Sequence, residues 1–530
     1  MLQTLGSGTE PPSRSESAMN PRPRLALLPA LALASVLHAQ PAPPRRVQAV
    51  LDRPEFAHAS WGMEFYDLDS RKTIFALNPA RLFVPGSTTK LLTTGTAFAT
   101  LGPDHRFRTR VYRTGPVRSG VLEGDLVLVA SGDPNLSRWE HPEGSYAFID
   151  QDHSYGGQPL PSDPLTALRY LAQQVAARGI RSITGQVLVD ASLFREGTRE
   201  LGTRIVMSPL VINDNVVDIV VTPAARAGEP ASVEVSPRTS YLTVHANIVT
   251  ADSGTASALR TVEDSTDRDH RTLVISGRVP RGDASNPRWA VPVPSRFGEI
   301  VFSELLNAAD VRAIPRLGAR ILDPSAPARP YSDSMMVAEH VSLPFSAAAR
   351  VILKTSQNLH ASNMPLLLGA QPAARAAGKS GFDLAREWLQ GASLTLDGAV
   401  QGDGAGGDAF FSPAFMTRYL ALVATQPWAA AFTDALPILG VDGTLAKIQV
   451  NAAGAGKVFA KTGTYSSYDP LNRRTIVHAK GLAGYFTSKS GKRMAFAIYV
   501  NNVAIASGDP ALLAGQALGE IASLAWEIIR

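Results

Sequence analysis

Two residues near the start of the chain have the types and the spacing needed for nucleophilic catalysis. Ser87-Thr88-Thr89-Lys90 places a serine and a lysine three positions apart, and residues at i and i+3 share one face of a helix. A serine hydroxyl needs a base to accept its proton, and a lysine amine that is removed from water can be neutral and act as that base. Leu91 and Leu92 follow Lys90 and give its amine an apolar neighbourhood. The pattern predicts a serine nucleophile with a lysine base, although an isolated Ser-x-x-Lys usually describes a solvated helix face.

The use of lysine in this chain supports a special role for Lys90. Only 10 of the 51 basic residues are lysines, and none lies between Lys90 and Lys354. Arginine is effectively always protonated, whereas the pKa of a lysine can be tuned, so a position that transfers protons must keep lysine. Lys90 and Lys461 fit this expectation. A further group is expected to consist of ordinary surface residues: Lys480, Lys489 and Lys492.

Two later segments carry polar groups suited to a catalytic cleft. Ser356-Gln357-Asn358 can point a hydroxyl and a carboxamide into one cleft if the backbone leaves the helix there. Lys461-Thr462-Gly463-Thr464 predicts a strand edge with a cation and two hydroxyls, and with a glycine where a ligand backbone must approach closely. Taken alone, the first segment is typical of a polar loop. The second segment, taken alone, is also a commonplace pattern.

Hydrophobic periodicity predicts the elements that position these residues. Alternation across residues 61–77, around a polar turn at 67–72, predicts a β-hairpin, and residues 87–101 predict a helix that Gly102 and Pro103 end. Helical periodicity returns at 347–359 and 382–389. A second hairpin (482–487 and 494–500) precedes a helix from Pro510, whose apolar stripe is expected to pack on the sheet. Short β-rich segments predict one or two inserted modules between about 108 and 320: 126–130, 187–189, 219–222, 242–248 and 272–279.

Composition narrows the class of protein. The chain has 530 residues, 45% hydrophobic and 18% charged, which predicts a folded protein of two to four domains. A net charge of +5 is too diffuse to indicate a nucleic-acid partner. The absence of cysteine excludes disulfides, thiol nucleophiles, Fe–S clusters and thiolate zinc sites, and the ten histidines show no metal-ligand spacing, so neither metal nor cofactor is predicted.

The amino end predicts export. Arg22 and Arg24 precede an apolar run at 25–37 that is too short to span a bilayer, which is typical of a secretory signal. We expect a signal peptide over residues 1–39, with Met19 as an alternative start. The mature protein is then periplasmic, extracellular or associated with the cell wall, with at most peripheral membrane association.

Together and in this order, the three motifs resemble those of the serine acyl-transferases of the penicillin-binding protein and β-lactamase group. Ser356 lies 269 residues after Ser87, and Lys461 lies 105 residues after Ser356. The long first interval is similar to that of class C low-molecular-mass penicillin-binding proteins, the D-alanyl-D-alanine carboxypeptidase/endopeptidase family. The resemblance runs from about Ala57 to the end and includes further segments: Val84-Pro-Gly-Ser-Thr-Thr-Lys-Leu, Leu101-Gly-Pro, Gly120-Val-Leu-Glu-Gly-Asp-Leu, Gly132-Asp-Pro, Lys354-Thr-Ser-Gln-Asn-Leu, Asp403-Gly-Ala-Gly and Gly481-Leu-Ala-Gly-Tyr.

The resemblance implies an α/β (α+β) fold. A penicillin-binding transpeptidase or β-lactamase-like domain, with an antiparallel sheet flanked by helices and a helical subdomain, is interrupted by a β-rich insertion. The expected parts are the signal at 1–39, the first part of the transpeptidase-like domain at 40–107, the insertion at 108–334 and the second part at 335–530. A linker-like segment at 323–330 closes the insertion.

The resemblance also implies a role for each site residue. Ser87 attacks the carbonyl between two D-alanines, Lys90 accepts its proton, and the backbone N–H groups of Ser87 and Thr464 stabilise the oxyanion. Ser356 relays a proton to the leaving amine, and Asn358 holds the substrate amide and the Lys90 amine in register. The segment Lys461-Thr462-Gly463-Thr464 binds the terminal carboxylate, and the charge of Lys461 helps to keep Lys90 neutral.

Three features bear on the substrate. Asp133, in Gly132-Asp-Pro, matches a family position that contacts the third residue of the stem peptide, although Asp-Pro is also a common turn. Asp403-Gly-Ala-Gly-Gly-Asp-Ala lacks the arginine with which the family often continues, which puts a preference for diaminopimelate in doubt. The stretch 465–480 is longer than usual and predicts an extended hairpin that overhangs the cleft.

The expected partners are peptidoglycan stem peptides, with β-lactams as covalent inhibitors. Two alternatives stay open at this point: a β-lactam or ester hydrolase on the same scaffold, distinguished by a short-lived penicillin acyl-enzyme, and a catalytically silent wall-binding protein. The glycine pattern that begins at Gly402 lacks the βαβ unit of a dinucleotide site. A further acidic cluster predicts a solvated turn: Glu263, Asp264, Asp267, Asp269 and His270.

Overall fold

The computed structural model describes residues 41–138, 140–156, 158–264, 266–267, 270–314, 331–505 and 508–530. They belong to one compact unit, Gln40–Arg530. The predicted signal segment and the linker at 323–330 lie outside the described residues. No helix in the described part of the chain is long and apolar enough to cross a bilayer.

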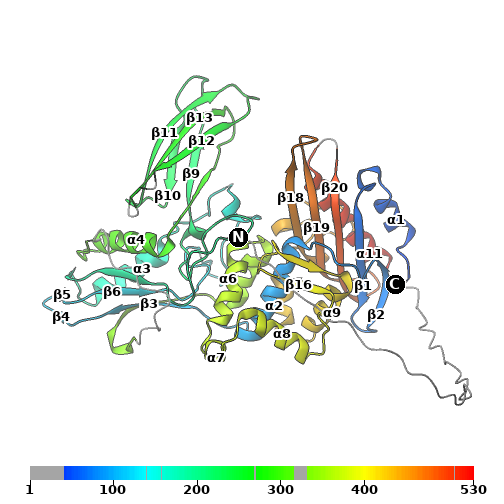
Figure 1. The fold of residues 1–530 in the computed structure, drawn as a ribbon, viewed down its shortest axis with the longest axis horizontal. Helices are drawn as coiled ribbons and strands as arrows, with labels where there is room; N and C mark the ends of the chain where they lie inside the picture. The colour runs from blue at the N-terminus through cyan, green and yellow to red at the C-terminus, as the bar shows by residue number, and fades with distance from the viewer. Residues whose placement is uncertain are drawn as a thin grey trace, which may run out of the picture. The chain divides into compact units, whose positions relative to one another are not determined.

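A five-stranded antiparallel sheet joins the two ends of the chain. Its strand order is β18-β19-β20-β1-β2, so strands coloured blue and strands coloured orange to red lie side by side in Figure 1. The two predicted hairpins are confirmed, because β1 pairs with β2 and β19 pairs with β20. The strand bounds are β1 Ser60–Asp67, β2 Lys72–Leu77, β18 Val458–Asp469, β19 Arg474–Thr487 and β20 Arg493–Ala504.

Strand β20 shows how this sheet separates two cores. Successive side chains of a strand point to opposite faces. Phe496 and Ile498 therefore pack with Leu518 and Ile521 of α11 (Pro510–Ile528), which confirms that the terminal helix covers the sheet. On the other face, Tyr499 packs with the group of helices that carries the site. Two short helices lie near the start of the described chain, α1 (Arg45–Leu51), which contacts α11, and the 3-10 turn η1 (Pro54–Phe56).

Helices on the second face surround α2, which carries Lys90. α2 contacts α5, α6 and α8, and α9 packs against β1 and β20. The expectation of one helix over 347–359 is wrong: α5 ends at Lys354, and α6 begins at Asn358. The bounds in this group are α2 Thr89–Leu101, α5 Phe345–Lys354, α6 Asn358–Gly369, α7 Pro372–Ala376, α8 Gly381–Gly391, α9 Pro413–Val423, α10 Ala429–Asp434, η2 Gly86–Thr88 and η6 Gly443–Leu445, with a ribbon of β16 Ala399–Gln401 and β17 Ala409–Phe411.

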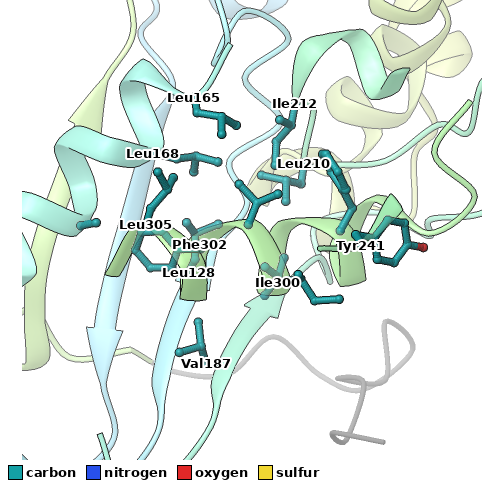
Figure 2. Packing of buried hydrophobic residues seen from close by; sticks show 14 of the residues in the cluster. Leu128, Leu165, Leu168, Val187, Leu210, Ile212, Tyr241, Ile300, Phe302 and Leu305 are labelled. Carbon is teal, nitrogen blue, oxygen red and sulfur yellow. The ribbon is translucent and has the colours of Figure 1, made fainter. Parts of the chain in front are cut away.

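The middle of the chain forms further sheets with two helices of its own. One four-stranded sheet has the order β15-β3-β6-β8, and α3 and α4 pack on it. Figure 2 shows Leu168 of α3 and Phe302 of α4 beside Leu128 and Val187 of the strands. The β-rich expectation missed these two helices. The bounds are β3 Arg108–Arg113, β4 Val117–Arg118, β5 Val121–Leu122, β6 Leu126–Val129, β7 Ser182–Ile183, β8 Val187–Asp190, β15 Met336–Val341, α3 Thr166–Ala177 and α4 Pro294–Ala308.

Three three-stranded sheets complete this middle region, with the orders β4-β5-β7, β10-β9-β14 and β11-β13-β12. All five β segments expected between 108 and 320 coincide with strands of the structure, although the first extends one residue past the end of β6. The domain boundaries stay a prediction, and β15, which follows the expected boundary at 334/335, pairs with β3. The remaining bounds are β9 Val216–Thr222, β10 Ser232–Ser236, β11 Leu242–Ala251, β12 Ala258–Asp264, β13 Arg271–Pro280, β14 Arg288–Ala290, η3 His153–Tyr155, η4 Asn213–Asn215 and η5 Asp333–Met335.

Candidate active site

Ser87 and Lys90 meet at the start of α2. The turn η2 carries Ser87 and runs directly into α2, and Lys90 Nζ lies 2.6 Å from Ser87 Oγ. Lys90 is fully buried. Its amine also donates to Asn358 Oδ1 at 2.6 Å and reaches Ser356 Oγ and the Ala405 carbonyl, each at 3.4 Å. The structure therefore brings three predicted site residues, from segments far apart in the sequence, around the amine of a fourth, Lys90.

Burial sets the protonation of Lys90. Loss of water lowers its pKa to about 8, while the carboxylates of Asp152, Glu200 and Asp403 act in the opposite direction. Burial is the largest cause, and the expected contribution of the Lys461 charge stays a prediction. An amine with a pKa near 8 exists partly in the neutral form at physiological pH and can accept a proton.

A break between two helices presents Ser356 and Asn358. Ser356 has φ of +64°, a left-handed conformation that ends α5. The Gln357 side chain then caps α6 by accepting a hydrogen bond from the Leu359 N–H at 2.8 Å. Both Ser356 and Asn358 line a cavity that also holds Ser87. The condition stated from the sequence, that the backbone leaves the helix here, is met.

Strand β18 forms one wall of this cavity through Thr462 and Thr464. Lys461 is fully buried behind that wall, where its ammonium donates to the Thr462 carbonyl at 2.8 Å. Burial, together with the charges of Lys90 and Lys480, lowers the pKa of Lys461 well below its usual value. Lys461 itself does not line the cavity, so it acts on an occupant only through this wall.

Gly463 serves a different purpose from the one expected. A Cβ at this position would lie 2.1 Å from the Pro85 carbonyl oxygen and 3.1 Å from the Ser87 nitrogen. Gly86, with φ of +52°, has a matching role, since its Cβ would lie 2.7 Å from the Thr464 nitrogen. The glycines let β18 and η2 pack backbone against backbone, and this contact brings the amides of Ser87 and Thr464 together. The expectation that Gly463 makes room for a ligand backbone is corrected.

The cavity has a volume of about 590 Å³, and residues from the middle of the chain line its other side. Asp152 Oδ2 accepts the Asn358 N–H at 2.8 Å, and the Tyr155 hydroxyl accepts from Asn358 Nδ2 at 2.8 Å. Burial raises the pKa of Asp152. Sequence reasoning missed both residues, because the Asp152-x-Ser154 pattern indicates only a local turn.

Asp133 is not brought to this site. It does not appear among the described residues that line the cavity. Its side chain is buried and accepts the Asn135 N–H at 2.9 Å, and burial raises its pKa to about 7. Its contact with the third residue of a stem peptide stays a prediction.

A buried charge network lies behind α6. Asp214 accepts from Arg138 at 2.9 Å, lies 2.8 Å from His360 Nε2 and lies 3.1 Å from His153 Nδ1. Burial alone would raise the pKa of Asp214, but the Arg138 and His360 charges and the hydrogen bonds lower it well below its usual value. His360 follows Asn358 by two residues, and His153 follows Asp152 directly. Asp214 therefore connects the segment that contains Asn358 with the segment that contains Asp152.

A second buried pair supports the wall that contains Thr462. Lys354 donates to Asp442 Oδ2 at 2.6 Å and to the Leu436 carbonyl at 2.8 Å. This pair anchors the segment leading to η6, where Thr444 Oγ1 lies 2.7 Å from Thr462 Oγ1. The position of Thr462 thus depends on a lysine just before the Ser356 motif.

The two unusual segments noted in the sequence both border the site. β18 and β19 stay paired as far as Asp469 and Arg474, which confirms an extended hairpin, and Tyr465 and Ser466 of this hairpin line the cavity. The glycine-rich stretch after Gly402 packs against protein backbone, since a Cβ at Gly404 would lie 2.0 Å from the Ala361 carbonyl oxygen. In the described part of the chain, no group of three or more His, Asp or Glu side chains could hold a metal ion.

Comparison with known proteins agrees with this geometry. Residues 45–518 match the D-Ala-D-Ala carboxypeptidase 3 (S13) family. The chain is 27% identical to a D-alanyl-D-alanine carboxypeptidase of Actinomadura sp., over 86% of this chain and 80% of that protein. It is 22% identical to D-alanyl-D-alanine carboxypeptidase DacB of Haemophilus influenzae, over 82% of this chain and 84% of that protein. The fold is similar to that of a crystal structure of H. influenzae penicillin binding protein 4, with a TM-score of 0.68 and 19% identity over 91% of this chain and 99% of that one. A crystal structure of the same protein in complex with a β-lactam gives a TM-score of 0.66, with the same identity and coverage. This chain belongs to the D-Ala-D-Ala carboxypeptidase 3 (S13) family.

Proposed function

We propose that this member of the S13 family uses Ser87 to cleave peptide bonds next to D-alanine in peptidoglycan stem peptides. The observation that carries the proposal is the buried Lys90 amine, 2.6 Å from Ser87 Oγ and 2.6 Å from Asn358 Oδ1, beside a cavity open to a substrate. A family likeness supports a serine peptidase, and this geometry supports Ser87 and Lys90 as its reacting groups.

Acylation uses the neutral form of Lys90. Its nitrogen accepts the Ser87 proton as Ser87 Oγ bonds to the carbonyl carbon, and the negative charge moves to the carbonyl oxygen. The backbone N–H groups of Ser87 and Thr464 stabilise that oxygen. The close packing of η2 on β18 supports this pair of donors, because Gly463 lets the two backbones approach.

Collapse of the tetrahedral intermediate breaks the C–N bond and releases the amine of the leaving residue. The proton that this amine needs passes from Lys90 through Ser356, whose hydroxyl lies 3.4 Å from Lys90 Nζ. Water then attacks the acyl-enzyme, its proton returns to Ser87, and the shortened peptide leaves with a carboxylate. Asn358 holds the amine of Lys90 throughout and offers its amide to the substrate.

The cavity wall recognises the end of the peptide. Thr462 and Thr464 both line the cavity and present hydroxyls to a terminal carboxylate. Lys461 adds positive potential from behind them. β-Lactams are the corresponding inhibitors, which the name penicillin binding protein of the H. influenzae relative supports. A cell-wall substrate also supports the export that the amino-terminal sequence predicts.

Release of D-alanine and covalent labelling test the proposal together. A peptide that ends in D-Ala-D-Ala is expected to lose one D-alanine in the presence of the wild type, and fluorescent penicillin is expected to label it at Ser87. The Ser87→Ala variant is expected to do neither, while Ser490→Ala serves as a matched control outside the cavity. An adduct that mass spectrometry places on another residue refutes the assignment. A penicillin adduct that hydrolyses within seconds indicates a β-lactam hydrolase instead.

A further inference from the structure

Lys480 occupies an unexpected place at the site. It was expected to be a surface residue, and that expectation is wrong: it lies on β19 directly opposite Thr464 of β18, and it lines the cavity. Its Nζ donates to Thr464 Oγ1 at 2.8 Å. It is the one lysine or arginine among the described residues that line this cavity.

The other two lysines of the site cannot contact an occupant in the same way. Lys90 and Lys461 are fully buried, and neither lines the cavity. The Lys461 ammonium is already engaged with the Thr462 carbonyl. Of these three lysines, Lys480 alone offers an ammonium to the cavity as its described lining residues form it.

No carboxylate of the described residues forms an ion pair with Lys480. Burial lowers its pKa to about 8, and the more distant charge of Asp509 acts against this. The Lys480 side chain is half-buried in the cavity wall, and removing a cation from water is costly unless the cation is paired. Such an ammonium therefore gains more from an anionic ligand than a solvated surface lysine does.

The neighbouring helix leaves room for this side chain. A Cβ at Gly515 of α11 would lie 3.2 Å from Lys480 Cε, so a larger residue there would press on the lysine stem. Gly515 lines the same cavity, together with Ile448 and Leu518. The position of the ammonium beside Thr464 thus depends on a specific gap in α11.

We propose that Lys480, together with the hydroxyl of Thr464, binds the terminal carboxylate of the substrate. This carboxylate is on the carbon that also carries the leaving amine. The inference rests on the proposed function and adds a specificity-determining residue to it. Thr464 Oγ1 accepts its hydrogen bond from Lys480, so its own O–H remains able to donate to the substrate. A carboxylate placed there receives one neutral and one charge-assisted hydrogen bond.

A pair of substrates that differ only in this charge tests the assignment. One peptide ends in D-Ala-D-Ala with a free carboxylate, and the other ends in the corresponding amide. The wild type is expected to prefer the acid. Lys480→Met is expected to lower kcat/KM for the acid about 10- to 100-fold, mainly through KM, because a hydrogen bond to a charged group is lost. The amide should be cleaved as before, and exposed Lys489→Met should behave as the wild type.

A second variant tests the same contact from the opposite side. Gly515→Ala keeps the lysine but crowds its stem, and it should reduce the preference for the acid by a smaller factor. An unchanged acid-to-amide ratio in Lys480→Met overturns the inference, and so does an equal loss on both substrates. A wild type that cleaves neither peptide and takes up no penicillin overturns the proposed function, and this inference falls with it.

Discussion

The Lys90 amine lies equally close, at 2.6 Å, to Ser87 Oγ and to Asn358 Oδ1. A neutral lysine amine has two N–H groups and one lone pair. Because the carbonyl oxygen of Asn358 can only accept, it must receive an N–H, and this leaves the lone pair free to face the Ser87 hydroxyl. Asn358 therefore orients Lys90 as a base rather than only as a cation.

Lys90→Arg should abolish acylation while it keeps the positive charge. A guanidinium does not give up its proton near neutral pH, so it cannot accept the proton of Ser87. We expect the rate of acylation by fluorescent penicillin to fall about 10²- to 10⁴-fold, the usual contribution of general-base catalysis. The exposed Lys457→Arg is the control and should acylate normally. Acylation at the wild-type rate in a folded Lys90→Arg protein removes Lys90 from the base role.

The acylation rate should rise with pH through about 8. Burial lowers the pKa of Lys90 to about 8, and only the deprotonated amine accepts the serine proton, so activity is low below that pH and levels off above it. The measurement needs a neutral ester substrate, because Lys480 loses its charge in the same range and would weaken the binding of a carboxylate. A rate that stays constant from about pH 6 to about pH 9 contradicts a lysine base.

The sequence predicted the parts of the site that depend on local pattern. Ser87 and Lys90 share a helix face, and the periodicity of the two hairpins and of α11 placed these elements on the sheet. The residues that were missed act over long sequence separations. Asp152 contacts Asn358 across 206 positions, and no periodicity reports such a contact.

The scarcity of lysine relative to arginine was a useful indicator of functional positions, but it was applied to too few of the lysines. The preference of this chain for arginine pointed to Lys90 and Lys461, but Lys480 was grouped with Lys489 and Lys492 as an ordinary surface residue. Its burial comes from pairing with β18 and from the gap at Gly515, neither of which is visible in the local sequence. The break at Ser356 was stated only as a condition for the site, and the helix over 347–359 was expected to be continuous because apolar periodicity runs across it.

Asp214→Asn should destabilise the protein and slow acylation. The change removes the negative charge shared by Arg138, His153 and His360, and breaking a buried ion pair costs about 3–5 kcal/mol in the free energy of unfolding. Asn358 and Asp152 lie next to this network, so acylation should fall as well. Chemical denaturation and penicillin labelling measure the two effects. Exposed Asp397→Asn is the matched control, and a variant as stable as the wild type contradicts a structural role for the network.

The stability of the wild type should also fall on the alkaline side. Burial would lower the pKa of His153, but hydrogen bonds to Asp214 and Asp218 raise it to about 9, above its value of about 6.5 in the unfolded chain. Because the pKa of His153 is higher in the folded state, protonated His153 contributes its full stabilisation at pH values below its pKa in the unfolded chain. This contribution is lost as pH rises through about 9. The free energy of unfolding, measured from about pH 6 to about pH 9.5, should decline less steeply in His153→Gln than in the wild type. Parallel curves contradict a charged His153.

Gly463→Ala should damage the site without touching any side chain that reacts. Its Cβ would lie 2.1 Å from the Pro85 carbonyl oxygen, so β18 must move away from η2 and carry the Thr464 amide away from Ser87. A displacement of about 1 Å can cost about 10²-fold in rate, and we expect acylation by penicillin to fall by that order. Overpacking should also lower the free energy of unfolding by about 1–3 kcal/mol. Gly391→Ala is the control, because its Cβ meets no atom within 4 Å, so it should neither slow acylation nor lower the free energy of unfolding. Acylation at the wild-type rate in Gly463→Ala would show that the backbone contact between β18 and η2 does not position the oxyanion donors.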